Sequence, residues 1–132
     1  MRITCNGQVF EDSFIYGMIT NSASVGGVLD ISDFLFDDGE FEITLIKQPD
    51  SALDLHKTVR FLRDIHEISG DEKLIFLKAS DITVELLDDS DVPWTVDGEY
   101  MQNASKLHIV NHKRAVSMLV PRDAGSNCFQ AR

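Results

Sequence analysis

Short apolar runs separated by turn signals predict a chain built mainly of strands. Residues 2–5 and 8–10 flank Asn6-Gly7, and Asn-Gly is a strong hairpin signal because both turn residues take positive φ. The chain is therefore expected to open with a β-hairpin. Residues 14–20 form a nearly continuous apolar run, which is typical of a strand covered on both faces.

Further strands are predicted along the rest of the chain. Between residues 41 and 47, Phe41, Ile43 and Leu45 alternate with polar residues, as in a β-strand. Residues 22–40 show neither the strand nor the helix period and are expected to form a long ordered loop. The other strands are expected at residues 74–77, 82–86, 94–96, 107–110 and 115–120, with the last two joined through residues 111–114.

One helix is predicted after residue 50. Ser51 can cap its N-terminus, with Asp54 three residues later, and a basic stripe on one face is interpreted as solvated, with contact to lipid or phosphate as the alternative. The apolar face would hold Leu55, Val59, Leu62 and His66, and the basic stripe Lys57, Arg60 and Arg63.

About eight strands and one helix indicate a mainly β fold, a two-layer β-sandwich or a barrel with one helical excursion. We expect a single domain over residues 1–132.

The charge of the chain argues against some partners. Its 132 residues carry 22 acidic and 12 basic side chains, for a formal net charge of −10. Because nucleic-acid binding needs Lys and Arg to neutralise phosphates, we expect no nucleic-acid partner. The same charge opposes adhesion to an anionic membrane, except through a local basic stripe.

The sequence also favours a cytoplasmic protein. No segment reaches 18 consecutive apolar residues, the N-terminus lacks the pattern of a secretory signal, and Cys5 and Cys128 stand at no zinc-binding spacing. Two isolated thiols suit a reducing compartment. Peripheral contact with the inner face of the membrane and formation of an oligomer are both compatible with this sequence.

Two Asp-Gly motifs carry the candidate chemistry. The first, Asp37-Asp38-Gly39, lies in an acid-rich stretch ahead of a predicted strand. Hard oxygen ligands at this density can hold Mg²⁺ or Ca²⁺, but Asp and Gly are also favoured turn residues, so a purely structural turn is the alternative. An EF-hand does not fit, because Phe34 would occupy the first ligand position.

The second motif is Asp97-Gly98-Glu99, beside Trp94 and Tyr100. A carboxylate fixed at a turn between apolar neighbours can act as a general base that takes a proton from a hydroxyl nucleophile. The alternative is an ordinary surface hairpin turn. Gly26-Gly27 lacks the glycine spacing and the lysine of a phosphate-binding loop, so the chain has no evident cradle for a nucleotide.

The order of these motifs resembles a known family. Asn21-Ser22, Gly26-Gly27, Asp37-Asp38-Gly39, Asp97-Gly98-Glu99 and a closing Leu119-Val120-Pro121 resemble the C-terminal half of soluble bacterial diacylglycerol kinases, lipid kinases related to sphingosine kinases. The resemblance covers residues 8 to 121. It implies the C-terminal β-sandwich of the fold shared by diacylglycerol kinases and NAD kinases. It also implies a partner, an N-terminal α/β nucleotide-binding domain with a Gly-Gly-Asp-Gly-Thr motif, which these 132 residues do not contain.

The resemblance also implies roles for individual residues. Glu99 matches the catalytic acidic residue of the family, proposed to activate the lipid hydroxyl. Asp38 matches the aspartate of a Mg²⁺ site, and the backbone carbonyls of Leu35 and Glu40 are its expected companions. Residues 31–35 depart from the Pro-x-Ala element usual in the family and are about one residue short, which affects the Leu35 assignment more than that of Asp38.

The resemblance therefore predicts part of an ATP- and Mg²⁺-dependent lipid kinase that phosphorylates diacylglycerol to phosphatidic acid. The missing domain would bind most of the nucleotide, so the chain alone is expected to be inactive. Phosphatidylglycerol, sphingoid bases and polyprenols are alternative substrates, because no motif marks an acyl-chain site. The alternative function is a stand-alone, non-catalytic acidic β-sandwich that binds a divalent cation or a protein partner.

Overall fold

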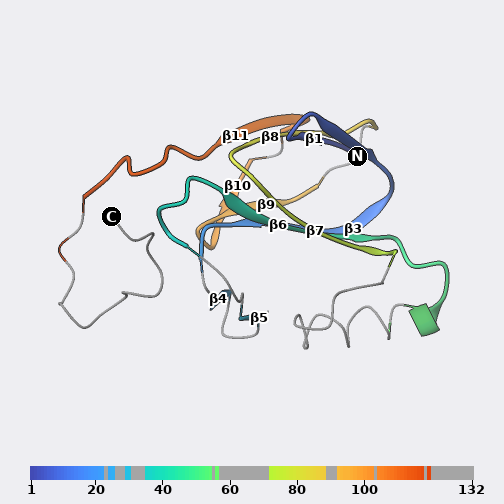
Figure 1. The fold of residues 1–132 in the computed structure, drawn as a ribbon. Helices are drawn as coiled ribbons and strands as arrows, with labels where there is room; N and C mark the ends of the chain where they lie inside the picture. Colours follow the sequence, from blue (N-terminus) through green and yellow to red (C-terminus); the bar gives the residue numbers. More distant parts are fainter. Residues whose placement is uncertain are drawn as a thin grey trace.

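Two antiparallel sheets form the body of the protein (Figure 1). The computed structural model describes residues 1–22, 24–25, 29–30, 35–54, 56, 72–88, 92–102, 104–117 and 119. The first sheet has the strand order β11-β8-β1-β2 and the second the order β3-β6-β7. The strands of the first sheet are β1 (Arg2–Cys5), β2 (Gln8–Glu11), β8 (Asp81–Glu85) and β11 (Lys106–Val110).

The chain crosses between the two sheets at two short corners. The second sheet contains β3 (Phe14–Thr20), β6 (Phe41–Lys47) and β7 (Leu74–Ala79). Asp12 and Ser13 join β2 to β3, and Ser80 alone separates β7 from β8. At these two corners the chain changes layer, so β2 and β3 lie in opposite sheets, as do β7 and β8 (Figure 1).

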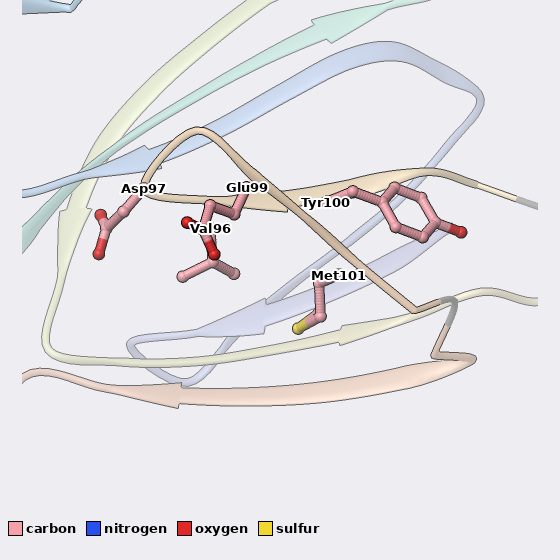
Figure 2. Close-up of a pocket in the computed structure, with 5 residues that line it drawn as sticks. All are labelled: Val96, Asp97, Glu99, Tyr100 and Met101. Carbon is pink, nitrogen blue, oxygen red and sulfur yellow. The ribbon is translucent and has the colours of Figure 1, made fainter.

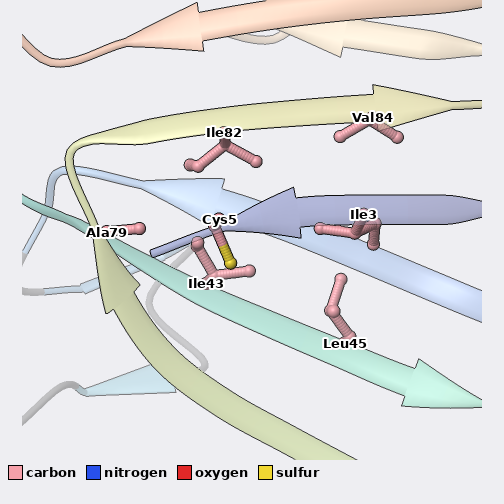
Figure 3. Close-up of a cluster of buried hydrophobic side chains, with 7 residues drawn as sticks. All are labelled: Ile3, Cys5, Ile43, Leu45, Ala79, Ile82 and Val84. Carbon is pink, nitrogen blue, oxygen red and sulfur yellow. The ribbon is translucent and has the colours of Figure 1, made fainter. Parts of the chain in front are cut away.

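The core lies between the two sheets. Side chains of β1 and β8 point toward those of β6 and the end of β7 (Figure 3). All of them are at most 3% exposed: Ile3, Cys5, Ile82 and Val84 from the first sheet, and Ile43, Leu45 and Ala79 from the second. This packing confirms the mainly β, two-layer fold predicted from the short apolar runs.

The opening hairpin is confirmed in detail. β1 pairs with β2 in antiparallel register, with Ile3 opposite Phe10. Asn6 and Gly7 have φ values of 51° and 72°, as a two-residue turn with positive φ at both central positions requires.

Burial on the second sheet differs from the prediction. Residues 14–20 do form a strand, but β3 lies at the edge of its sheet, and Ile15 and Tyr16 are 50% and 45% exposed. The central strand β6 is instead covered on both faces, so Glu42 and Thr44 are buried as deeply as the apolar residues between which they alternate. The apolar run at residues 14–20 therefore did not mark the strand that is covered on both faces. That strand is β6, and it is covered because it is central in its sheet.

The segment predicted as a loop and the predicted helix are described in part. β4 (Ser24–Val25) and β5 (Leu29–Asp30) form a short antiparallel pair within residues 22–40, which adds regular structure that the sequence did not predict. Residues 52–54 and 56 are helical, and the Ser51 hydroxyl accepts a hydrogen bond from the Asp54 N–H at 3.2 Å, as predicted for the cap. The apolar positions and the basic stripe predicted for the helix lie outside the described residues.

Of the predicted final strand pair, the first strand is confirmed as β11, but the second is wrong over its described residues. Residues 115–117 and 119 are not in a strand. Instead, the Ala115 N–H donates to the His112 carbonyl in a turn, and Arg114 takes a left-handed φ of 54°. The turn directs the chain away from β11 (Figure 1), so residues 115–117 do not pair with this edge strand.

The strand predicted at residues 94–96 is present and is the first strand of a hairpin. β9 (Trp94–Val96) pairs with β10 (Glu99–Met101), a strand that the sequence pattern missed. Among the described residues, no helix has both the length and the apolar character needed to cross a membrane.

Candidate functional site

Asp38 lies in a tight turn that leads into β6. Its Oδ1 atom accepts a hydrogen bond from the backbone N–H of Glu40 at 3.0 Å, the bond by which an aspartate closes a turn on its own backbone. Gly39, between them, has a φ of 84°, which a residue with a Cβ adopts only with strain. The Asp38 side chain is only 9% exposed, so its carboxylate is held in a fixed place.

Residues 111–114, which we call the strap, cross this turn. The Asn111 side-chain amide donates to the Glu40 carbonyl at 3.1 Å. Arg114 donates from Nε and Nη2 to one oxygen of Asp37, Oδ2, at 3.0 and 2.8 Å. The residues expected to form a loop between two strands thus hold the acidic turn.

A buried ion pair lies beside the turn. Glu42 on β6 is opposite Lys78 on β7, and the Lys78 Nζ atom lies 3.1 Å from Glu42 Oε1 and 3.7 Å from Asp38 Oδ2. Neither Glu42 oxygen has a hydrogen-bond donor among the described residues, so the contact with Lys78 is an ion pair without good hydrogen-bond alignment. Burial raises the pKa of Glu42, although Lys78 acts in the opposite direction.

The ligands expected for Mg²⁺ here are the carboxylate of Asp38 and the backbone carbonyls of Leu35 and Glu40. Among the described residues, no group of three His, Cys, Asp or Glu side chains gathers to hold a metal, so main-chain oxygens and water would have to complete the coordination. A carbonyl oxygen has two lone pairs, and Glu40 uses one for Asn111. One carboxylate, two carbonyls and several waters would be a ligand set of the kind that Mg²⁺ takes, although the Asp38 carboxylate already has the Glu40 N–H and the Lys78 ammonium beside it.

Glu99 lies on a different element, the β9–β10 hairpin. Asp97 and Gly98 form its turn with φ values of 51° and 85°, as the Asp-Gly pair predicts. Trp94 at the base packs against the core, which fixes the hairpin to the body of the protein. The Glu99 side chain is exposed.

The hairpin lines an open hollow with a volume of about 530 Å³ (Figure 2). In that view Asp97 and Tyr100 point toward opposite ends of the hairpin, with Glu99 between them. The lining residues that belong to the described part of the chain all come from this hairpin: Val96, Asp97, Glu99, Tyr100 and Met101. A second surface, from another domain or from a ligand, would be needed to enclose a molecule bound here.

The structure thus brings Asp38 and Glu40 into one turn, with Leu35 at its start, and places Glu99 on a separate hairpin. Sequence reasoning missed Lys78 and the strap residues Asn111 and Arg114. Lys78 belongs to an ordinary strand pattern, and Asn111 and Arg114 lie 71 and 77 residues from the groups that they contact. No local signal in the sequence connects positions so far apart.

Comparison with solved structures identifies proteins with a similar fold. No protein-family model matches the sequence, and no curated protein matches it significantly. A protein of Bacillus anthracis str. Sterne, provisionally named a diacylglycerol kinase, matches over 83% of this chain with 26% identity and a TM-score of 0.53. The chain has a diacylglycerol kinase-like fold.

Two further structures of diacylglycerol kinases from the same organism, one of them also provisionally named, share this fold. They match over 84% and 87% of the chain with TM-scores of 0.58 and 0.55, each with 22% identity. The matches confirm the resemblance predicted from the order of the motifs. The chain spans 33–43% of the length of these three kinases.

Proposed function

We propose that this chain forms part of an ATP-dependent lipid kinase that transfers the γ-phosphoryl group to the hydroxyl of diacylglycerol. The observation that carries the proposal is the diacylglycerol kinase-like fold over more than four-fifths of the chain. An α/β domain outside these 132 residues would bind most of the nucleotide. The resulting product would be phosphatidic acid.

Glu99 is the proposed general base. Its exposed carboxylate on the β9–β10 hairpin can accept the hydroxyl proton as the lipid oxygen attacks the γ-phosphorus and the bond to ADP breaks. Val96 and Tyr100 on the same hairpin are 55% and 68% exposed, and they offer apolar surface to the acyl chains of a lipid.

Asp38 is the proposed cation ligand, with the carbonyls of Leu35 and Glu40. A bound Mg²⁺ would supply positive charge against the buried Asp38 carboxylate and would order the turn. Asp38 holds the Glu40 N–H, which keeps the Glu40 carbonyl in the same turn. In this proposal the Asp38 turn binds the cation, and Glu99 accepts the proton of the lipid hydroxyl.

The test of the base is Glu99→Gln in the protein that joins this chain to its nucleotide-binding domain. We expect the rate of diacylglycerol phosphorylation from ATP to fall by about 10²–10⁴-fold, the usual contribution of a positioned base. Glu72→Gln is the matched control, because Glu72 is also exposed but lies away from the hairpin. Unchanged turnover in Glu99→Gln, with an unchanged circular dichroism spectrum, would remove Glu99 from the mechanism.

A second candidate function is a non-catalytic cation-binding module. It would use the Asp38 turn, which Asn111 and Arg114 hold through Glu40 and Asp37. Reading the genome upstream of Met1 in frame separates the two candidates. A Gly-Gly-Asp-Gly-Thr domain there would support the kinase, and Mg²⁺ binding in a protein with no such domain would support the module.

A further inference from the structure

We propose that Asn111 and Arg114 are positioning residues that hold the Asp38 turn in its cation-binding geometry. This inference rests on the proposed cation site and adds to it a strap from the opposite end of the chain. Neither residue is a cation ligand in the proposal. They act through Asp37, Asp38 and Glu40.

The strap is itself firmly anchored. The backbone N–H of Asn111 donates to the Ser80 carbonyl at 2.8 Å, at the corner where the chain passes from β7 to β8. Its side chain then donates to the Glu40 carbonyl. Asn111 therefore ties the turn to the point where the two sheets meet, and the direction of the Glu40 carbonyl depends on that tie.

Arg114 controls the charge of the turn. Asp37 and Asp38 are adjacent carboxylates, and their side chains are only 16% and 9% exposed. Like charges this close repel, and partial burial increases the repulsion. By pairing with Asp37, Arg114 leaves Asp38 as the carboxylate available to a cation, in competition with Lys78, whose Nζ lies 3.7 Å from Asp38 Oδ2.

Gly39 permits the close approach of the strap. A Cβ atom built on Gly39 would lie 2.9 Å from Lys113 Cβ, closer than real side chains come. The strap therefore packs directly on the backbone of the turn. The strap packs on Gly39 and bonds to Asp37 and Glu40 on either side of it, so the turn has little freedom to rearrange.

A substitution at Arg114 separates positioning from simple electrostatics. Arg114→Gln removes a positive charge beside the proposed site. If the residue acted only through its charge, cation binding would become tighter, because a competing cation would be gone. If it positions the turn, binding weakens in spite of the more negative site.

The experiment is calorimetric titration of Mg²⁺ into the 132-residue chain and its variants. We expect Arg114→Gln and Asn111→Ala each to raise the Kd by about 10-fold or more, as loss of groups that orient metal ligands commonly does. Arg114→Lys, which keeps the charge and can still reach Asp37, should recover part of the affinity. Arg2→Gln is the matched control, because Arg2 also pairs with a carboxylate, Glu11, but on the first sheet.

A spectroscopic measurement checks the mechanism. Luminescence lifetimes of bound Tb³⁺ in H₂O and D₂O count the waters on the ion, and Asn111→Ala should gain about one water as the Glu40 carbonyl turns away. A strap variant that did not fold would appear in its circular dichroism spectrum, and Arg114→Lys would then carry the test.

The outcomes distinguish the inference from the function on which it rests. If wild type binds Mg²⁺, Asp38→Ala does not, and Arg114→Gln binds as tightly as wild type or more tightly, the positioning role is wrong and the cation site stands. If wild type itself binds no Mg²⁺, both the cation site and the positioning role fail.

Discussion

At the scale of single residues, Glu42 and Lys78 decide the character of the region beside the Asp38 turn. Glu42 has an exposed fraction of 0%, whereas Lys78 is 30% exposed and lies near both Glu42 and Asp38. A buried carboxylate is costly without a partner, because it has left water without compensation. Lys78 supplies the positive charge that makes this arrangement of acidic residues tolerable.

Lys78→Met should therefore destabilise the fold. It keeps the length of the side chain but leaves Glu42 buried without its counter-charge, and we expect the free energy of unfolding at neutral pH to fall by about 3 kcal/mol. Urea denaturation measures this loss. Lys73→Met is the control: its ion pair with Asp50 is exposed, and such pairs contribute at most about 1 kcal/mol. Equal losses in the two variants would contradict the role given to Lys78.

At the scale of elements, two glycine turns have nearly the same φ and different surroundings. Gly39, before β6, and Gly98, between β9 and β10, have φ values of 84° and 85°. Nothing lies within 4 Å of a Cβ built on Gly98, whereas a Cβ on Gly39 would meet Lys113. The first turn is covered by the strap, and the second is open to solvent and to a ligand.

Alanine substitution should separate these effects. Gly98→Ala carries only the cost of a left-handed backbone with a Cβ, about 1–2 kcal/mol. Gly39→Ala carries the same cost and must also displace the strap, so its loss of unfolding free energy should be clearly larger. The difference between the two variants in chemical denaturation measures the contact. A loss in Gly39→Ala no larger than in Gly98→Ala would mean that the strap yields freely.

At the scale of the whole molecule, salt bridges join strands and corners around the outside of the sandwich. Asp12, at the corner between the two sheets, pairs with Lys47 at 3.0 Å, and Glu85 on β8 pairs with Lys106 of β11 and with Arg2 of β1. A hydrogen bond from Lys47, with one from the Ser13 N–H, lowers the pKa of Asp12. Lys106 and then Arg2 lower the pKa of Glu85 in the same way.

These shifts predict the direction of acid sensitivity. A carboxyl whose pKa is lower in the folded state contributes stability that is present above its unfolded pKa and is lost as pH falls through its folded pKa. Asp12→Asn and Glu85→Gln should therefore lower stability at neutral pH and make the urea midpoint less dependent on pH on the acid side. Glu72→Gln, at an exposed glutamate, is the control. Acid dependence in both variants that matches wild type would contradict this account.

Local patterns predicted much of the fold. Asn6-Gly7, the Ser51 cap and the apolar runs predicted turns and strands that the structure contains, because hairpin turns, caps and strand periods depend on neighbours in sequence. The Asp37-Asp38-Gly39 and Asp97-Gly98 motifs were likewise recognised as turns. What these local rules could not supply was the place of each strand in its sheet, and therefore which strand is buried on both faces.

The sequence by itself thus determined a mainly β domain, two acidic turns, and an order of motifs that resembles diacylglycerol kinases. Tertiary structure alone decided that β6 is central and β3 lies at the edge, that Lys78 neutralises Glu42, and that the strap, predicted as a connecting loop, holds Asp37 and Glu40. The physical reason is the separation in sequence between the residues that interact. Turns and periods arise within a few residues, whereas burial, ion pairs and the strap depend on segments that meet only after the two sheets have packed.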